Sequence, residues 1–110
     1  MPIPDSRNAI AEQAKVRDYL LNADHPDGGA KAAWFFDRGY STDQWQVLAE
    51  DLLEIARICD DFDTETSSYG VKYIASGQVG LSGHSAGAVL TVWIVEDGAP
   101  PRLVTAYPEH

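Results

Sequence analysis

The sequence predicts an α+β fold, in which about three N-terminal helices pack on one face of a roughly four-stranded antiparallel sheet. Apolar residues of the N-terminal half recur at helical spacing, whereas from Tyr69 onward they alternate with a period of two. A chain of 110 residues can bury one modest core. We therefore expect a single domain over 1–110, helical over about 6–60 and folded as a sheet over about 66–108.

Two helices are expected before residue 40. The first runs from about Ser6 to Asn22 and places Val16, Tyr19 and Leu20 on one face, a face that Ile10 does not match well. The second is the short segment "AKAAWFFDRG", which Gly39 ends. Between them, "NADHPDGG" is rich in residues that break helices.

The third helix, over residues 41–59, has the clearest pattern. Ser41 and Gln44 have the spacing of a capping box at its start. Its expected buried stripe comprises Trp45, Leu48, Leu52, Ile55 and Cys59. The following stretch "CDDFDTETSS" is acidic and polar, and it lacks the spacing and the glycine of a calcium-binding loop. We expect a solvated connection there, with no metal.

Four strands are expected at about 69–74, 77–83, 88–96 and 102–108. A hairpin centred near Ala99 would pair Trp93 with Thr105 and Thr91 with Tyr107, and directly opposed residues share a face. The other face of this hairpin is apolar and is expected to pack on the helices; its residues are Leu90, Val92, Ile94, Val104 and Ala106.

Composition restricts the classes of function. The net charge is −9, and residues 1–65 hold 14 acidic and 6 basic side chains, so the protein repels nucleic acid at long range. No apolar run is long enough to span a membrane, and no signal peptide is visible. The single cysteine, Cys59, excludes an internal disulfide. We expect a cytoplasmic protein that has no membrane partner.

The segment "GHSAG", residues 83–87, matches the nucleophile-elbow motif of serine hydrolases around Ser85. That motif requires a helix after the serine, whereas "AGAVLTVWIVE" is the strongest strand pattern in the chain. A flexible loop between two strands explains the segment better, and His84 is an exposed titratable group in that loop. Hydrolysis by Ser85 remains a third hypothesis.

Two sets of residues are candidates for chemistry. Thr91, Trp93, Thr105 and Tyr107 would form a face of hydroxyls and rings that can hold phosphates and stack bases, although such residues are also ordinary on a solvated sheet face. His25 could act as a general acid or base, and Lys31 opens a helix where an anion is favoured. The alternatives without a function are that His25 is an ordinary loop residue before a proline and that Lys31 is a solvated surface lysine. Lys72 and His84 are second-tier candidates.

The segments "KVRDYLLNADHPDGGAKAAWFFDRGYS", "GVKYIASGQVGL" and "LTVWIVEDGAPPRLVTAYP" carry a family resemblance over about residues 15–108. They resemble a family of small prokaryotic proteins that contain a domain of unknown function. They are also similar to toxin modules of the barnase–EndoU–colicin–RelE nuclease superfamily.

The resemblance implies helices followed by a sheet and RNA cleavage without a metal or cofactor. Carried over by position, the family's His-Pro and lysine element falls on His25 and Lys31, and its final Thr-Ala-x-Pro falls on Thr105 and Tyr107. It also implies an antitoxin or immunity protein as a partner, besides RNA as substrate. The competing hypothesis is a non-catalytic acidic binding module or accessory subunit, because the first 65 residues carry a net charge of −8.

Overall fold

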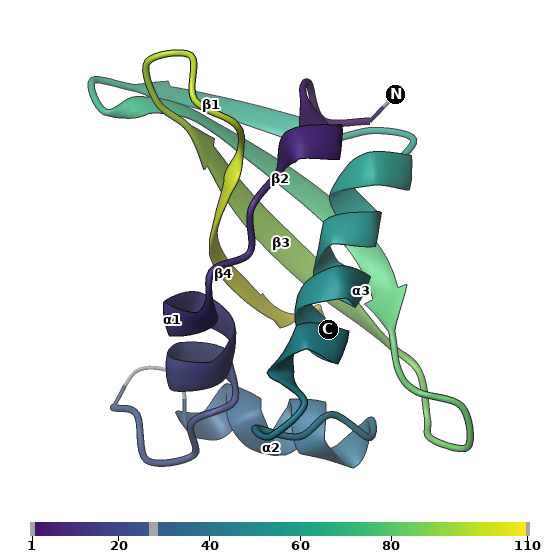
Figure 1. The fold of residues 1–110 in the computed structure, drawn as a ribbon. Helices are drawn as coiled ribbons and strands as arrows, with labels where there is room; N and C mark the ends of the chain where they lie inside the picture. Colours follow the sequence, from purple (N-terminus) through teal and green to yellow (C-terminus); the bar gives the residue numbers. More distant parts are fainter. Residues whose placement is uncertain (1, 27–28, 110) are drawn as a thin grey trace.

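A computed structural model describes residues 2–26 and 29–109 (Figure 1). In chain order the elements are η1 Ser6–Asn8, α1 Gln13–Lys15, η2 Val16–Leu20, α2 Gly29–Asp37, α3 Trp45–Ile58, β1 Asp63–Ser67, β2 Gly70–Val79, β3 Gly87–Val95 and β4 Arg102–Pro108. The helices precede the strands and lie on one face of the antiparallel sheet, as Figure 1 shows. The predicted α+β arrangement is confirmed.

The sheet has the strand order β1-β2-β3-β4, with two differences from the expected strands. β1 lies inside the acidic segment that was expected to be a loop, and all five of its residues are exposed. No apolar alternation therefore marks it, and the strand exists because it pairs with β2. The two short strands expected over 69–83 are one ten-residue strand, β2.

The first expected helix is shorter than predicted. Ile10 is extended and pairs with the edge of β4: its N–H donates to the Pro101 carbonyl at 2.8 Å, and its carbonyl accepts from Leu103 N–H at 2.9 Å. This pairing explains why Ile10 did not match the helical face. Residues Val16–Leu20 form a π-turn, closed by a 2.9 Å bond from Leu21 N–H to the Val16 carbonyl.

The core lies between the helices and the sheet, and the predicted stripe of α3 contributes to it. Leu48, Leu52 and Ile55 are buried, as expected. Helix α3 approaches β2 closely at Gly77, where an added Cβ would lie 2.5 Å from Ile55 Cγ1. Each fully buried large apolar side chain of this core stabilises the fold by about 1.5–3 kcal/mol relative to an exposed one.

The predicted faces of the β3–β4 hairpin are wrong. Trp93 pairs with Leu103 and Thr91 with Ala106, and both Thr91 and Trp93 are fully buried on the helix side. Their polar atoms are satisfied there. The Thr91 hydroxyl donates to the Ala75 carbonyl at 2.7 Å, and Trp93 Nε1–H donates to Thr91 Oγ1 at 2.9 Å.

A β-bulge in β4 separates Thr105 and Tyr107 from the face of Thr91 and Trp93. Val92 pairs with Thr105 and Trp93 with Leu103, so Val104 is an extra residue on β4. One extra residue reverses the faces of all residues beyond it. Thr105 and Tyr107 therefore do not share the buried face of Thr91 and Trp93. Of the apolar set that was expected under the helices, Leu90, Ile94 and Val104 are only half-buried.

The helices are short. No helix among the described residues has the length and apolar character needed to cross a bilayer.

Candidate functional site

The contacts of the Lys31 ammonium group join three elements at the edge of β4. Lys31 Nζ, from α2, donates to the phenol oxygen of Tyr19 at 2.7 Å and to the hydroxyl of Thr105 at 3.1 Å. The Thr105 hydroxyl in turn lies 3.3 Å from the Tyr19 oxygen, to which it donates. Tyr19 and Thr105, which are 86 positions apart in the chain, thus meet at one cation.

Aromatic rings surround the same ammonium. Lys31 Nζ lies 4.9 Å from the centre of the Tyr19 ring and 5.5 Å from that of Tyr107. The His25 imidazole packs edge-on against Tyr19, with 4.9 Å between the ring centres. We call these residues the edge cluster: Tyr19, His25, Lys31, Thr105 and Tyr107.

The electrostatic setting of Lys31 is unusual for a lysine. Its side chain is half-buried, and it forms no ion pair among residues 2–26 and 29–109. The nearby carboxylate of Asp18 pairs with Arg17 Nε at 2.8 Å. A half-buried cation whose described partners are rings and hydroxyls favours an anionic ligand, because an anion compensates a charge that burial has partly removed from water.

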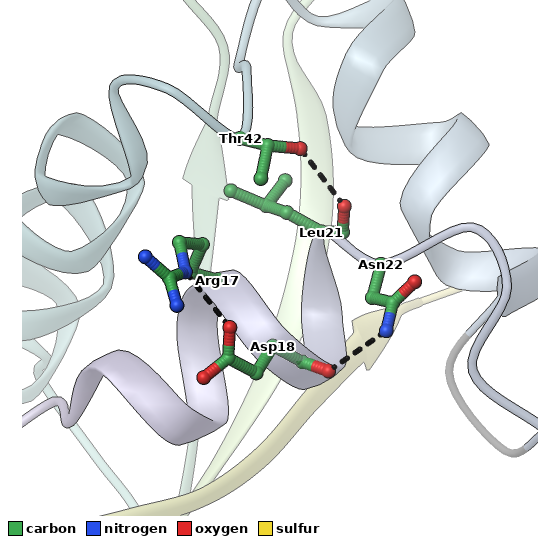
Figure 2. Close-up of polar contacts among 5 residues, drawn as sticks. All are labelled: Arg17, Asp18, Leu21, Asn22 and Thr42. Carbon is green, nitrogen blue, oxygen red and sulfur yellow. Dashed lines mark hydrogen bonds and ion pairs between the residues drawn. The ribbon is translucent and has the colours of Figure 1, made fainter.

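The segment that carries Tyr19 is held by side-chain bonds to its carbonyls, drawn in Figure 2. Thr42, from the connection before α3, donates its hydroxyl to the Leu21 carbonyl at 3.1 Å. Asn22 donates its amide to the Asp18 carbonyl at 3.2 Å. These bonds satisfy carbonyls at the end of the π-turn, a position where a helix leaves such groups without partners. They fix the backbone on both sides of Tyr19.

Backbone bonds also fix His25 against the start of α2. Its N–H donates to the Asn22 carbonyl at 3.1 Å, and its carbonyl accepts from Gly29 N–H at 2.9 Å. A Cβ at Gly29 would lie 2.5 Å from the Ala23 carbonyl oxygen, so the loop closes this tightly only with glycine there. The backbone of His25 is therefore bonded directly to the first residue of α2, the helix that carries Lys31.

An open groove of about 650 Å³ adjoins the edge cluster. Its lining residues are Ala14, Lys15, Asp18, Tyr19, His25, Val104 and Thr105. Its volume lies within the range of ligand pockets, roughly 300–1,000 Å³. The groove gives a ligand access to the imidazole and to the hydroxyls that Lys31 bonds.

The structure brings together four of the residues proposed from the sequence and separates the other four. His25, Lys31, Thr105 and Tyr107 meet in the edge cluster. The assignment of Thr91 and Trp93 to a substrate-binding face is wrong, because both are buried in the core. Lys72 lies on β2 between Glu65 of β1 and Ile94 of β3, and His84 packs on Gly39.

Sequence reasoning missed Tyr19. It was placed on an apolar helical face, and only its phenol oxygen distinguishes it from a core residue. The π-turn that carries it is a feature enriched at functional sites, but a π-turn has no sequence pattern that would have revealed it.

The segment around Ser85 is a loop, as expected. Residues 82–86 are exposed, and the strand β3 begins at Gly87, where a nucleophile elbow would need a helix. The described residues also hold no group of three His, Cys, Asp or Glu side chains that could bind a metal ion.

A second polar contact lies outside the edge cluster and joins Tyr40, Asp51 and Gly80. Tyr40 is almost fully buried, donates its hydroxyl to Asp51 Oδ2 at 2.6 Å and accepts from Gly80 N–H at 2.9 Å. Burial, together with the Asp51 carboxylate, raises the pKa of the Tyr40 phenol well above its usual value. Tyr40 therefore remains a neutral hydrogen-bond donor across the physiological pH range.

Fold and edge cluster together define a class of protein: a small α+β domain in which a lysine, a histidine and hydroxyl groups meet at one edge of the antiparallel sheet. The sequence model of one protein family matches residues 2–110. The chain belongs to that family, which is described as a domain of unknown function, DUF6883. No curated protein matches the chain.

A solved structure shares the fold. It is a chain of a contact-dependent growth inhibition toxin–immunity protein complex from Klebsiella pneumoniae 342, with a TM-score of 0.73. The match is 19% identical and covers 96% of this chain and 97% of that chain. At this identity the likeness establishes the common fold alone.

Proposed function

We propose that the protein is a metal-independent endoribonuclease of the toxin or effector type, with the edge cluster as its active site. The observation that carries the proposal is Lys31, a half-buried cation without an ion pair among the described residues, held beside His25 and Thr105. An imidazole, an ammonium and hydroxyls are the groups that phosphodiester cleavage without a metal requires.

In the proposed reaction the ribose 2′-oxygen attacks phosphorus. The 2′-O–P bond forms and the P–O5′ bond breaks, which yields a 2′,3′-cyclic phosphate and a 5′-hydroxyl. The 2′-hydroxyl loses a proton and the 5′-oxygen gains one, and His25 serves as the general base or acid for this transfer. Lys31 uses two of its three donors on described hydroxyls, and the third is available for a non-bridging oxygen of the phosphorane.

The remaining residues of the edge cluster would position RNA. Tyr107 is 40% exposed, which suits stacking against a base, and Thr105 can hold a phosphate oxygen. Tyr19 keeps the ammonium in place through its oxygen and its ring. The sheet face that was expected to bind RNA is not part of this proposal, since Thr91 and Trp93 are buried.

The distribution of charge reduces the objection that a protein with a net charge of −9 repels RNA. Residues 43–65 hold eight acidic residues and one basic residue, whereas residues 1–40, which contain three members of the edge cluster, hold six acidic and five basic. Most of the net negative charge thus lies in residues 43–65, a range that includes α3 and the start of β1. Repulsion from charges beyond a Debye length of about 8–10 Å is largely screened at physiological salt.

The shared fold with a chain of a toxin–immunity protein complex supports a toxin-type role, with an antitoxin or immunity protein as partner. The resemblance to the nuclease superfamily supports RNA as the substrate. Within this proposal the protein acts on RNA in the cytoplasm, and Lys72 and His84 have no direct role because they lie outside the edge cluster.

The test compares cleavage of total RNA by the purified protein and by Lys31→Met and His25→Ala variants. Each variant is expected to cut about 100-fold more slowly, the typical contribution of one electrostatic or acid–base group. Lys72→Met, which removes a lysine elsewhere on the sheet, is the matched control and should cut at the parental rate. Equal cutting by all four proteins, or none by the parent, would refute the proposal.

A second candidate function is a non-catalytic acidic module that binds a basic partner. The concentration of negative charge in residues 43–65 favours it. This function predicts that the protein co-purifies with a basic partner and leaves RNA intact in the same assay. RNA binding by the isolated protein at sub-millimolar concentration would count against it.

A further inference from the structure

The outer edge of β2 is only partly covered by its neighbour. β1 pairs with the first half of β2, and this pairing ends at Asp63 opposite Ile74. β2 itself continues to Val79, paired on its inner edge with β3 throughout. The last five residues of β2, 75–79, therefore have no strand partner on their outer edge among the described residues.

The hydrogen-bonding direction of these residues follows from the other side of the sheet. Glu109 N–H donates to the Ala88 carbonyl at 2.9 Å, so the backbone groups of Ala88 point towards β4 and away from β2. Gln78 is opposite Ala88 and forms a non-hydrogen-bonded pair with it, so its own N–H and carbonyl point to the outer edge. Because the hydrogen-bonding direction alternates from one residue of a strand to the next, the N–H and carbonyl of Ser76 also point to the outer edge.

The unpaired outer edge of residues 75–79 is bounded at both ends. On one side β1 covers the edge as far as Ile74, and on the other the Tyr40 hydroxyl accepts the Gly80 N–H at 2.9 Å. The backbone N–H and carbonyl groups of Ser76 and Gln78 lie between these two ends, and no backbone group of the described residues bonds them. An unpaired strand edge of this kind is a ready template for another strand.

An acidic groove of about 400 Å³ runs along this edge, between α3 and β2. Besides β2 and Gly80, it is lined by Asp51, Glu54, Ile55, Ile58, Cys59 and Asp60. Ile58 is 66% exposed, which is high for a large apolar side chain on a helix that packs on a sheet. The groove thus combines carboxylates with an exposed apolar residue, and residues 43–65 around it have a net charge of −7.

We propose that the outer edge of β2 binds an extended, cationic segment of a partner protein as an additional strand of the sheet. Main-chain bonds to Ser76 and Gln78 would supply affinity. Lysine or arginine side chains on alternate positions of the segment would meet Glu54 and its acidic neighbours, while apolar ones would cover Ile58. A second copy of this chain is disfavoured as the occupant, because it would bring another strongly acidic surface to the same edge.

The inference does not depend on RNA cleavage. β2 and β4 are separated by β3, and the edge cluster lies at β4, so a segment bound at the outer edge of β2 leaves the groove beside His25 open. An active nuclease and a non-catalytic binding module would present the same edge to a partner.

The test uses a fluorescein-labelled seven-residue peptide of alternating lysine and valine, with binding measured by fluorescence anisotropy. A peptide with glutamate in place of lysine is the charge control and should not bind. Gln78→Pro removes an outward N–H without breaking a bond to β3, and we expect it to weaken binding at least tenfold. Gln78→Ala is its matched control and should bind like the parent.

Charge reversal tests the electrostatic part of the site. Glu54→Lys should weaken binding of the lysine peptide at least tenfold, whereas Asp37→Lys, which makes the same charge change on α2, should have little effect. In the unaltered protein, the peptide should slow amide hydrogen exchange at Ser76 and Gln78 at least tenfold. This measurement decides the question even where the proline variant fails to fold.

Three outcomes would overturn the inference: peptide binding that Gln78→Pro leaves unchanged, absence of protection at Ser76 and Gln78, or self-association that Gln78→Pro abolishes. The last would identify a second copy as the occupant. Lys31→Met should retain peptide binding and Gln78→Pro should retain RNA cleavage, so this inference and the nuclease proposal fail separately.

Discussion

The β3–β4 hairpin contains two similar pairs of residues, of which one is buried and the other lies at the sheet edge. Thr91 and Trp93 on β3, a hydroxyl and a ring two positions apart, are fully buried under the helices. Thr105 and Tyr107 on β4, of the same character and spacing, lie at the sheet edge, where Thr105 bonds Lys31 and Tyr107 is 40% exposed. Residue type and strand period are the same in both, so neither decides which pair is available to a ligand.

The extra residue Val104 makes the difference. Up to Leu103 the hairpin keeps one register, in which Trp93 and Leu103 are opposite each other, and beyond Val104 the register is offset by one. Without the bulge, Thr105 and Tyr107 would share the buried face of Thr91. The candidate site therefore depends on a local irregularity in an edge strand, a place where bulges commonly reorient functional side chains.

The strongest test of this comparison removes the bulge. Deletion of Val104 should lower the free energy of unfolding by more than about 4 kcal/mol, because every residue beyond it on β4 changes face. Val104→Gly keeps the residue count and should cost no more than about 2 kcal/mol. Urea denaturation measures both, and a deletion variant as stable as the parent would show that the bulge does not set the faces.

The next test separates the two rings. Trp93→Ala should lower the free energy of unfolding by about 3–5 kcal/mol, the cost of a large cavity in the core. Tyr107→Ala should cost less than about 1 kcal/mol, since the ring is partly exposed, but it should slow RNA cleavage. Thermal denaturation with cleavage assays compares them. Equal losses of stability would contradict the contrast between core and edge.

Replacement of the buried Thr91 should likewise cost more stability than replacement of Thr105 at the edge. Thr91→Val keeps the shape of the side chain but leaves Trp93 Nε1–H and the Ala75 carbonyl without their hydroxyl partner, at a cost of about 1–3 kcal/mol for a buried unsatisfied group. Chemical denaturation followed by tryptophan fluorescence measures this. A cost near zero would mean that water or another group replaces the hydroxyl.

The smallest expected effect on stability is that of Thr105→Val. It removes one partner of the Lys31 ammonium at a partly solvated edge, so the free energy of unfolding should change by no more than about 0.5 kcal/mol. RNA cleavage should nevertheless fall roughly tenfold, since the ammonium loses a group that holds its position. A variant that cleaves at the parental rate would remove Thr105 from the proposed active site.

Much of the fold was predictable because it follows from patterns of burial. The stripe of α3 and the apolar runs of β3 and β4 mark their elements directly. β1 was not predictable, because its five exposed residues carry no apolar signal and its strand conformation comes from pairing with β2. Ile10 left the first helix for a similar reason, since it pairs with β4.

The candidate site was predictable in its parts. Loop chemistry singled out His25 and Lys31, and strand patterning singled out Thr105 and Tyr107. Their meeting was not predictable from the same patterns, and neither was the role of Tyr19. The hairpin register that was expected would have placed Thr91 beside Tyr107, where the structure has Ala106.

By itself, the sequence determined the order of helices and strands, the apolar stripes and the uneven distribution of charge, because these depend on local periodicity and composition. The tertiary structure decided which hydroxyls and rings face a ligand, where the edge of β2 stays open and which residues surround Lys31. These depend on the register between distant segments, and a shift of one residue in a strand exchanges the buried and the exposed face without changing the pattern of the chain.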